Sequence, residues 1–470
     1  MSDSLCWLSA LELAELVRTR QVSPVEIVEA VLARIDRLNP QLNAIITRAD
    51  DAAREAARRI EAAVVRGESV GPLAGVPITV KDLNLTAGIR TTLGSRRWAD
   101  FVPTHDSLIV RRLKAAGAIV VGKTNTSELG LVPLTRNALV GDAHNPWALD
   151  RNTGGSSGGA AAAVACGIGP IATGSDGGGS IRIPAAFCGV FGLKPHLGRI
   201  PHVAFPRGWE SLAHQGPLSR TVRDAALLLD ATAGPDPADR WSLPADGRSF
   251  VAACTGDARG LRLAWSPRLG SLPIEPNVLA VCEAAAARFA ELGCTVESVE
   301  LDLPDLSPAQ QVIVLCETAT AMAPDRECWQ RELDPLLERM LPKADRLTFH
   351  DLVAANWARE EYWERLWPVL EKYDALLTPT APIVAPACET LGPTEIAGQR
   401  VRALSWLGFC VPANMTWQPA ASLPAGFNAE GLPVGLQVIG RRFDEWTVLR
   451  LASAYEAAFP WTERRPPIAD

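Results

Sequence analysis

The stretch that decides the fold is Gly174-Ser175-Asp176-Gly177-Gly178-Gly179-Ser180-Ile181-Arg182-Ile183-Pro184. It follows an apolar run over residues 168–173, which predicts a buried strand. Three consecutive glycines let backbone N–H groups turn toward one point, as a developing oxyanion requires. The serine after them, Ser180, is therefore a candidate nucleophile. A glycine-rich turn alone is more often structural than catalytic, so this assignment depends on the surrounding chain.

A second loop rich in glycine and serine lies upstream, at Gly154-Gly155-Ser156-Ser157-Gly158-Gly159, before an Ala-rich helical pattern over 160–166. The motif Gly-x-Ser-x-Gly at 154–158 nominally matches the nucleophile elbow of α/β-hydrolases. That elbow requires an apolar strand before the serine, whereas residues 149–153 are mostly polar. No spacing points to a partner histidine either. Taken alone, this segment favours a flexible connecting loop.

A lysine, Lys81, stands at the end of the short apolar run 77–80, which predicts a buried strand. Burial would lower the pKa of such a lysine, and a neutral lysine can act as a base. Another lysine lies in residues 117–124, Gly-Ala-Ile-Val-Val-Gly-Lys-Thr, which fit the pattern of a phosphate-binding loop. The residues between these glycines themselves read as a strand after a helix, so we interpret the first glycine as a helix cap.

Helical and apolar segments alternate along the chain, which is typical of an α/β sheet covered by helices on both faces. Two capping boxes, Ser9-Ala10-Leu11-Glu12 and Ser23-Pro24-Val25-Glu26, start helices near the N-terminus, and Asn39-Pro40 is expected to end the second. We expect one domain over 1–470, with N-terminal helices in 1–66 and a core at about 70–235. The further predicted helices are 49–66, 106–116, 221–231, 276–292, 352–372 and 446–458, and the further strands are 118–121, 294–301, 375–378 and 434–439.

Composition argues against several classes of protein. Lys and Arg number 46 and Asp and Glu 53, which gives a net charge of −7, opposite to that of a nucleic-acid-binding protein. No signal-peptide pattern or spanning apolar run is evident, so we expect a cytoplasmic protein that does not bind a membrane. The ten cysteines and six histidines form no metal-binding spacing, so we predict free thiols, no metal and no cofactor.

Taken together, these segments resemble the amidase signature family. The resemblance covers residues 75–234 continuously and returns in 374–386 and 412–440. Lys81 and Ser156 are separated by 75 positions and Ser156 and Ser180 by 24, the intervals that the family's Ser-Ser-Lys triad usually shows. The blocks that carry the resemblance are Lys81-Asp82, Thr91-Thr92-x-Gly94-Ser95, Gly122-Lys123-Thr124-Asn125, the 154–159 loop and Asp176-x-Gly178-Gly179-Ser180-Ile181-Arg182-x-Pro184.

The resemblance implies an α/β fold with a large mixed central sheet and a catalytic site without a cofactor. Ser180 would be the nucleophile, Ser156 a bridging serine after a cis peptide from Gly155, and Lys81 the base. One hydroxyl can both donate and accept a hydrogen bond, so a serine can relay a proton. The oxyanion donors would include Gly177, Gly178 and Gly179, with Asp176 and Arg182 bracing the turn and Ser157 supporting the relay.

At three positions near the predicted site, this sequence differs from the residue that is usual in the family or in one of its subgroups. Gly177 stands where many members carry threonine or a larger residue, and Trp417 where the family usually has glycine. Trp417 either walls the acyl pocket or fills core space. Ile183 is apolar where the tRNA-dependent amidotransferase typically has glutamine in its A subunit. Ile183 and Trp417 are therefore candidate residues of the substrate pocket.

The function predicted from this resemblance is hydrolysis of small apolar or aryl amides through an acyl-enzyme, with esters, carbamates and amide oligomers as further substrates. One alternative is the A subunit of a glutamine-dependent tRNA amidotransferase. Another is a catalytically silent binding module, which is disfavoured because all three triad positions are filled. Both a monomer and a homodimer are compatible with the sequence.

Overall fold

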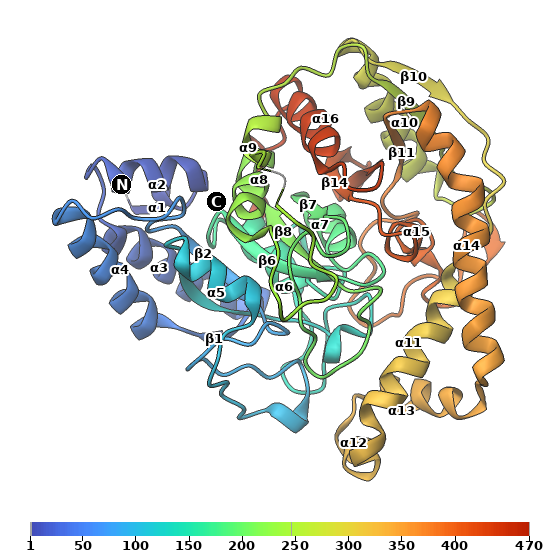
Figure 1. The fold of residues 1–470 in the computed structure, drawn as a ribbon, viewed down its shortest axis with the longest axis horizontal. Helices are drawn as coiled ribbons and strands as arrows, with labels where there is room; N and C mark the ends of the chain where they lie inside the picture. Colours follow the sequence, from blue (N-terminus) through green and yellow to red (C-terminus); the bar gives the residue numbers. More distant parts are fainter. Residues whose placement is uncertain (1, 246, 470) are drawn as a thin grey trace.

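A mixed sheet forms the centre of the computed structural model, which describes residues 2–245 and 247–469 (Figure 1). Within the described residues the sheet has eleven strands, drawn from positions 45 to 440. In spatial order they are β1 (Ile45–Arg48), β3 (Ile119–Thr124), β2 (Pro77–Lys81), β6 (Ile171–Asp176), β8 (His214–Ser219), β7 (Phe191–Lys194), β14 (Ala420–Phe427), β15 (Pro433–Gly440), β11 (Ala375–Pro379), β9 (Arg262–Trp265) and β10 (Thr295–Ser298).

The pairing of these strands is both parallel and antiparallel. β2 pairs parallel with β3 and β6, and β9 pairs parallel with β10 and β11. Antiparallel pairs join β6 to β8, β8 to β7, β7 to β14, β14 to β15 and β15 to β11. The predicted α/β class with a mixed central sheet is therefore confirmed.

Helices cover both faces of the sheet, as neighbouring residues of β6 demonstrate. Ile171 belongs to the large core that includes α8 and α16, whereas Ala172 belongs to a cluster with α6 and α7. Successive side chains of a strand point to opposite faces, so these two clusters lie on opposite sides of the sheet. The helices are α1 (Ser2–Leu5), α2 (Ala10–Arg18), α3 (Pro24–Leu42), α4 (Asp50–Val65), α5 (Leu108–Ala115), α6 (Gly158–Ala165), α7 (Arg182–Cys188), α8 (Val222–Thr232), α9 (Phe250–Ala253), α10 (Pro276–Glu291), α11 (Ser307–Met322), α12 (Arg326–Glu332), α13 (Pro335–Met340), α14 (Phe349–Lys372), α15 (Val411–Met415) and α16 (Glu445–Ala458).

Helices α2 and α3 begin where the sequence predicts, and α3 ends later than predicted. Ser9 and Ser23 both form complete capping boxes. The prediction that Asn39-Pro40 ends α3 is wrong, because the helix continues to Leu42 with Pro40 in its last turn. Asn39 still marks the boundary, since its Oδ1 accepts hydrogen bonds from the N–H groups of Ala44 and Ile45 at 2.9 and 2.7 Å. The chain then leaves the helix through Asn43, whose φ of +46° is left-handed.

The segment that fits a phosphate-loop pattern is a strand, as interpreted. Gly117 has a φ of +91° and follows α5, and residues 119–124 form β3. Lys123 is fully buried and donates hydrogen bonds to Thr86 Oγ1 at 3.0 Å and Thr91 Oγ1 at 2.8 Å. Its ammonium therefore forms hydrogen bonds with protein groups and is not placed to bind a phosphate.

Residues 307–346 form an arm that the sequence did not predict. It comprises α11, α12, α13 and two short 3-10 helices, Ala323–Asp325 and Leu341–Arg346, and it lies beside α14 in Figure 1. A small apolar cluster, including Met322, Trp329 and Leu337, packs its inner side against Val132. The arm therefore lies against the 129–132 loop, which borders the candidate site.

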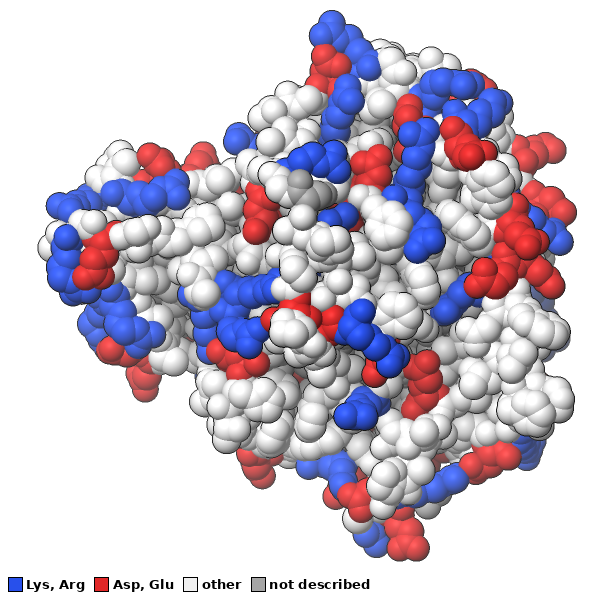
Figure 2. Space-filling model, viewed as in Figure 1, with Lys and Arg blue, Asp and Glu red and all other residues white. Residues whose placement is uncertain are grey.

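The surface carries charged side chains of both signs. On the face drawn in Figure 2, basic and acidic side chains are interspersed, without a large field of one sign. Among the described helices, none is both long and apolar enough to cross a membrane.

Candidate active site

Lys81 lies at the end of β2 and its side chain is fully buried. Its Nζ is within hydrogen-bond distance of three hydroxyls: Ser156 Oγ at 2.7 Å, Ser157 Oγ at 2.8 Å and Ser175 Oγ at 2.9 Å. A neutral amine has two N–H donors and one lone pair, so one of these hydroxyls can donate to it. The cluster can thus hold a neutral lysine with all its polar atoms satisfied.

Burial lowers the pKa of Lys81 to about 7, and the nearby Asp176 carboxylate opposes the shift only in part. Removing a lysine from water penalises its charged form, which is the cause of such a shift. At neutral pH a large fraction of this lysine is consequently unprotonated. The geometry and the lowered pKa together make Lys81 a candidate general base.

The 154–159 loop positions the two serines that meet Lys81. The Gly155–Ser156 peptide bond is cis. Gly155 packs so tightly on Leu134 that an added Cβ would lie 2.5 Å from a backbone carbon of that residue. The N–H of Ser157 donates a hydrogen bond to the Ser180 carbonyl at 3.1 Å, which links this loop to the glycine turn that carries Ser180. Both serines are thereby held between Lys81 and the glycine turn.

A buried ion pair supports the glycine turn from behind. Arg182 and Asp176 are both fully buried, with Nη2–Oδ1 and Nε–Oδ2 distances of 2.9 and 3.0 Å. The Arg182 guanidinium holds the pKa of Asp176 well below its usual range, although burial alone would raise it. The same carboxylate accepts hydrogen bonds from the N–H groups of Gly179 and Ile181 at 2.6 and 3.1 Å. Asp176 and Arg182 thus brace the turn that carries Ser180.

These contacts narrow the set of oxyanion donors that the sequence predicts. The Gly179 N–H is already donated to Asp176, so Gly179 cannot also serve a substrate in this arrangement. By contrast, the N–H groups of Gly177, Gly178 and Ser180 have no acceptor within the described part of the chain. These three groups are therefore the better candidates for binding an oxyanion.

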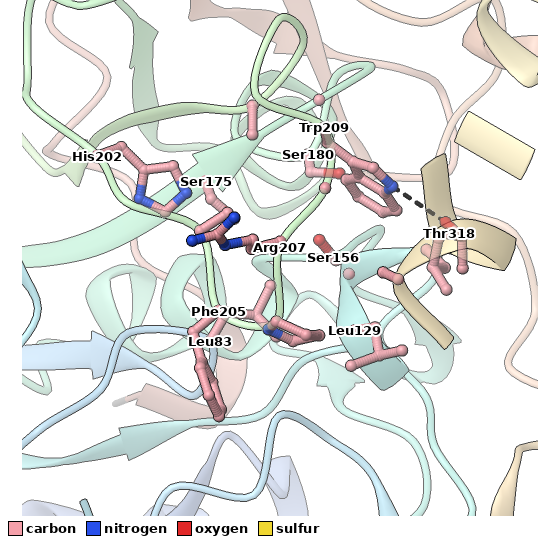
Figure 3. A pocket seen from close by; sticks show the side chains of 18 of the residues that line it. Leu83, Leu129, Ser156, Ser175, Ser180, His202, Phe205, Arg207, Trp209 and Thr318 are labelled. Carbon is pink, nitrogen blue, oxygen red and sulfur yellow. Dashed lines mark hydrogen bonds between the residues drawn. The ribbon is translucent and has the colours of Figure 1, made fainter. Parts of the chain in front are cut away.

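Ser156 and Ser180 line the same pocket, whose empty volume is about 780 Å³, including the part open to solvent. No hydrogen bond joins their hydroxyls among the described residues. In structures without a ligand, the hydrogen bonds of an active site often tighten only when substrate is bound. Figure 3 shows both serines among apolar side chains, with Arg207 and His202 also in view. The large apolar residues of this lining are Leu83, Leu129, Leu131, Phe205, Trp209 and Met322.

A second, more polar pocket adjoins the first at the glycine turn. It shares Ser180, Gly177 and Trp209 with the first pocket, and its empty volume is about 1340 Å³. Its own lining includes Gln310, Gln311, Lys343 and Arg402. Ser180 thus stands where an apolar pocket and a polar pocket meet.

Both residues predicted for the substrate pocket lie elsewhere. Ile183 is fully buried in the first turn of α7, in an apolar cluster with Leu134 and Phe187, and lines neither pocket. Trp417 also lines neither pocket; its Nε1 donates to the Ser211 carbonyl at 2.8 Å. Its φ is +69°, and its ring packs against that of Trp241 with the centroids 5.7 Å apart. A left-handed backbone at this position is what a glycine would adopt without strain.

Several residues of the site were not predicted. Ser175 contacts Lys81, and its place five residues before Ser180 in the same motif could have drawn attention to it. Asn414 and Gln437 accept hydrogen bonds from Arg182, both at 2.6 Å, and lie in the C-terminal segment of resemblance. Gln310 contacts the glycine turn from the 307–346 arm, and no motif in the sequence points to it.

The chain is similar to known amidases over most of its length. The family model named Amidase matches residues 26–449. An acylamidase from Rhodococcus erythropolis is 42% identical, covering 99% of this chain and 98% of that protein. The A chain of the glutamyl-tRNA(Gln) amidotransferase from Moorella thermoacetica is 38% identical, covering 98% and 99%. The solved structure of a bacterial aryl acylamidase of the amidase signature family superposes with a TM-score of 0.92 at 34% identity, covering 97% of each chain. The chain therefore belongs to the amidase signature family of enzymes, which hydrolyse amide bonds.

Proposed function

We propose that this enzyme hydrolyses small amides through an acyl-enzyme on Ser180, with Ser156 and Lys81 as its proton relay. The observation that supports the proposal best is the buried contact of 2.7 Å between Lys81 Nζ and Ser156 Oγ, beside the pocket that Ser180 lines. A serine hydroxyl needs a base to attack a carbonyl, and a lysine with a pKa of about 7 can supply one at neutral pH.

In the first step the Ser180 oxygen bonds to the substrate carbonyl carbon. The Ser180 proton passes to Ser156 as the Ser156 proton passes to Lys81, and the carbonyl oxygen becomes an oxyanion. The N–H groups of Gly177, Gly178 and Ser180 stabilise that charge. When the intermediate collapses, the C–N bond breaks and a proton returns from Lys81 through Ser156 to the leaving amine.

Water completes the cycle by the same route. The relay removes a proton from a water molecule as its oxygen attacks the acyl-enzyme carbonyl. The ester bond to Ser180 then breaks, and its oxygen regains a proton from Ser156. The products are a carboxylic acid and an amine, and Lys81 ends neutral, as it began.

The proposed substrates are amides with an apolar or aryl group, which fit the apolar lining around Leu129, Phe205 and Trp209. Esters and carbamates are further substrates because they pass through the same kind of tetrahedral intermediate. The relatives include an acylamidase and a component of an amidotransferase at similar identity, so similarity alone does not rank the two activities. The apolar pocket favours stand-alone hydrolysis over the transfer of ammonia from glutamine.

The direct test uses the purified chain with a panel of aliphatic amides, anilides and glutamine, together with a fluorophosphonate serine probe. We expect hydrolysis of apolar amides without a partner protein and labelling of Ser180. Labelling that persists in Ser180→Ala, or activity on glutamine alone that requires a partner, would contradict the proposal.

A further inference from the structure

Gln310 reaches the glycine turn from a part of the chain that lies about 130 positions after it. It belongs to the first turn of α11, and its Nε2 donates a hydrogen bond to the Gly177 carbonyl at 3.1 Å. The same Nε2 would lie 2.6 Å from a Cβ placed on Gly178. The side-chain amide therefore lies directly against the Gly177–Gly178 peptide, on the polar-pocket side of the turn.

The planarity of this peptide gives the contact a consequence for the neighbouring N–H. The Gly177–Gly178 bond is trans, and in a trans peptide the C=O and N–H point in opposite directions. A hydrogen bond that holds the Gly177 oxygen therefore also sets the direction of the Gly178 N–H. Because both flanking residues are glycine, no side chain restricts rotation of this peptide, and two orientations are open to it.

We propose that Gln310 is a positioning residue that selects the orientation in which the Gly178 N–H faces the oxyanion. This inference rests on the proposed function, in which that N–H stabilises the charge developed after attack by Ser180. Gln310 does not contact the reacting atoms in this scheme. It acts through the peptide that it holds.

The position of Gln310 is itself held by contacts of α11 with the pocket wall. Trp209, which lines both pockets, donates through Nε1 to Thr318 Oγ1 at 3.0 Å (Figure 3). The backbone N–H of Trp209 donates to the Glu317 carboxylate. These hydrogen bonds fix α11 against the loop that carries Trp209. They therefore also fix the position of Gln310 relative to the glycine turn.

The chain offers a matched control in Gln311. It is the next residue on the same helix, lines the same polar pocket, and is exposed without a hydrogen-bond partner within the described residues. Gln310→Met and Gln311→Met remove the same amide and keep a similar length. Gln310→Glu adds a carboxylate that repels the Gly177 oxygen instead of donating to it.

The experiment measures kcat and KM for an anilide with each variant, and the inhibition constant of a trifluoromethyl ketone, which forms an oxyanion when serine adds to it. For Gln310→Met we expect kcat to fall about 10- to 100-fold, somewhat less than the loss of an oxyanion donor itself. KM should change less than about 3-fold, and ketone affinity should fall in proportion to kcat/KM. Gln310→Glu should lose at least as much, whereas Gln311→Met should lose far less kcat than Gln310→Met, with any effect falling on KM.

Three further outcomes test this inference and the proposed function separately. If Ser180→Ala is inactive while folded Gln310→Met keeps kcat within about twofold, the positioning role is wrong and the nucleophile assignment stands. If Gln310→Met raises KM and leaves kcat unchanged, Gln310 is a substrate-binding residue, and the inference is also overturned. If Ser180→Ala retains activity, the proposed function itself fails. Circular dichroism and thermal melting check that each variant is folded.

Discussion

Arg182 and Asp176 form a fully buried, two-bond ion pair directly behind the glycine turn that carries Ser180, with N–O distances of 2.9 and 3.0 Å. On its other edge the Arg182 guanidinium donates to Gln437 in β15 and Asn414 in α15. The pair thus connects β6, α7, α15 and β15 at one point. The position of the turn that carries Ser180 therefore depends on these contacts of Arg182 and Asp176 near the centre of the sheet.

Replacing Arg182 with methionine should destabilise the fold and abolish labelling of Ser180. The change leaves the Asp176 carboxylate buried without its partner, and such losses typically cost about 3 to 5 kcal/mol. Urea denaturation measures the free energy of unfolding. The control is Arg365→Met, which breaks an ion pair of Arg365 with the fully exposed Asp302 and should cost less than about 1 kcal/mol. Equal losses in the two variants would contradict a bracing role for Arg182.

The family resemblance points to three candidate catalytic residues that local patterns do not single out, and their roles stay a prediction. Lys81, Ser156 and Ser180 come from a strand end and two loops, and the spacing within the motifs identifies them before any contact is known. The structure brings Lys81 and Ser156 into contact and places Ser156 and Ser180 in one pocket. Periodicity alone would have left the two glycine-rich loops as ordinary connections.

The substrate pocket was not predictable, because the direction of a side chain depends on the turn that precedes it. Ile183 lies three residues after Ser180, yet the first turn of α7 directs it into the core. Strand β8 also escaped prediction, since Gly216 and Pro217 disfavour a strand although both pair within the sheet. The arm that carries Gln310 approaches from residues 307–346, and only tertiary contacts reveal it.

Removing either member of the proposed relay should lose most amide hydrolysis, and the two losses should not add. Lys81→Ala and Ser156→Ala break the same proton path, so the double variant should be about as slow as the worse single variant. An ester with a good leaving group needs little protonation as it departs and should suffer less. The measurement is kcat/KM for an anilide and for a nitrophenyl ester in all four proteins. Equal losses on both substrates would argue that Ser156 is only structural.

Lys81 should also make stability depend on pH. Its pKa is about 7 in the folded protein and about 10.4 when unfolded, so between these values the unfolded state binds one more proton. The free energy of unfolding should therefore rise with pH in that window, by about 1.4 kcal/mol per pH unit from this group. Below about pH 7 both states carry the proton and the contribution becomes flat.

The measurement compares urea denaturation of the wild type and Lys81→Met at several pH values from 6 to 10. Methionine fills a similar volume and does not titrate, so the difference between the proteins isolates Lys81. A difference that is constant over this range would mean that the lysine keeps its proton in the folded protein.

The last prediction concerns the pH dependence of catalysis. If neutral Lys81 is the base, kcat/KM for a neutral amide should rise with pH through the lysine pKa, near 7, and then level off. A histidine base would ordinarily give a rise near pH 6.5. Burial lowers the pKa of His202, which lines the pocket, to about 4, so its titration should not produce a rise near 7.

Two variants show whether the rise of kcat/KM with pH comes from Lys81 or from His202. In Lys81→Arg the guanidinium stays charged throughout, so activity should fall at least about 100-fold and the rise should disappear. In His202→Gln the rise should keep its place, whatever happens to substrate affinity. Profiles from pH 5 to 10, with folding checked by circular dichroism, decide the matter. A folded Lys81→Arg enzyme with near-normal activity, or a rise that moves with His202, would remove Lys81 from the mechanism and leave Ser180 without its proposed base.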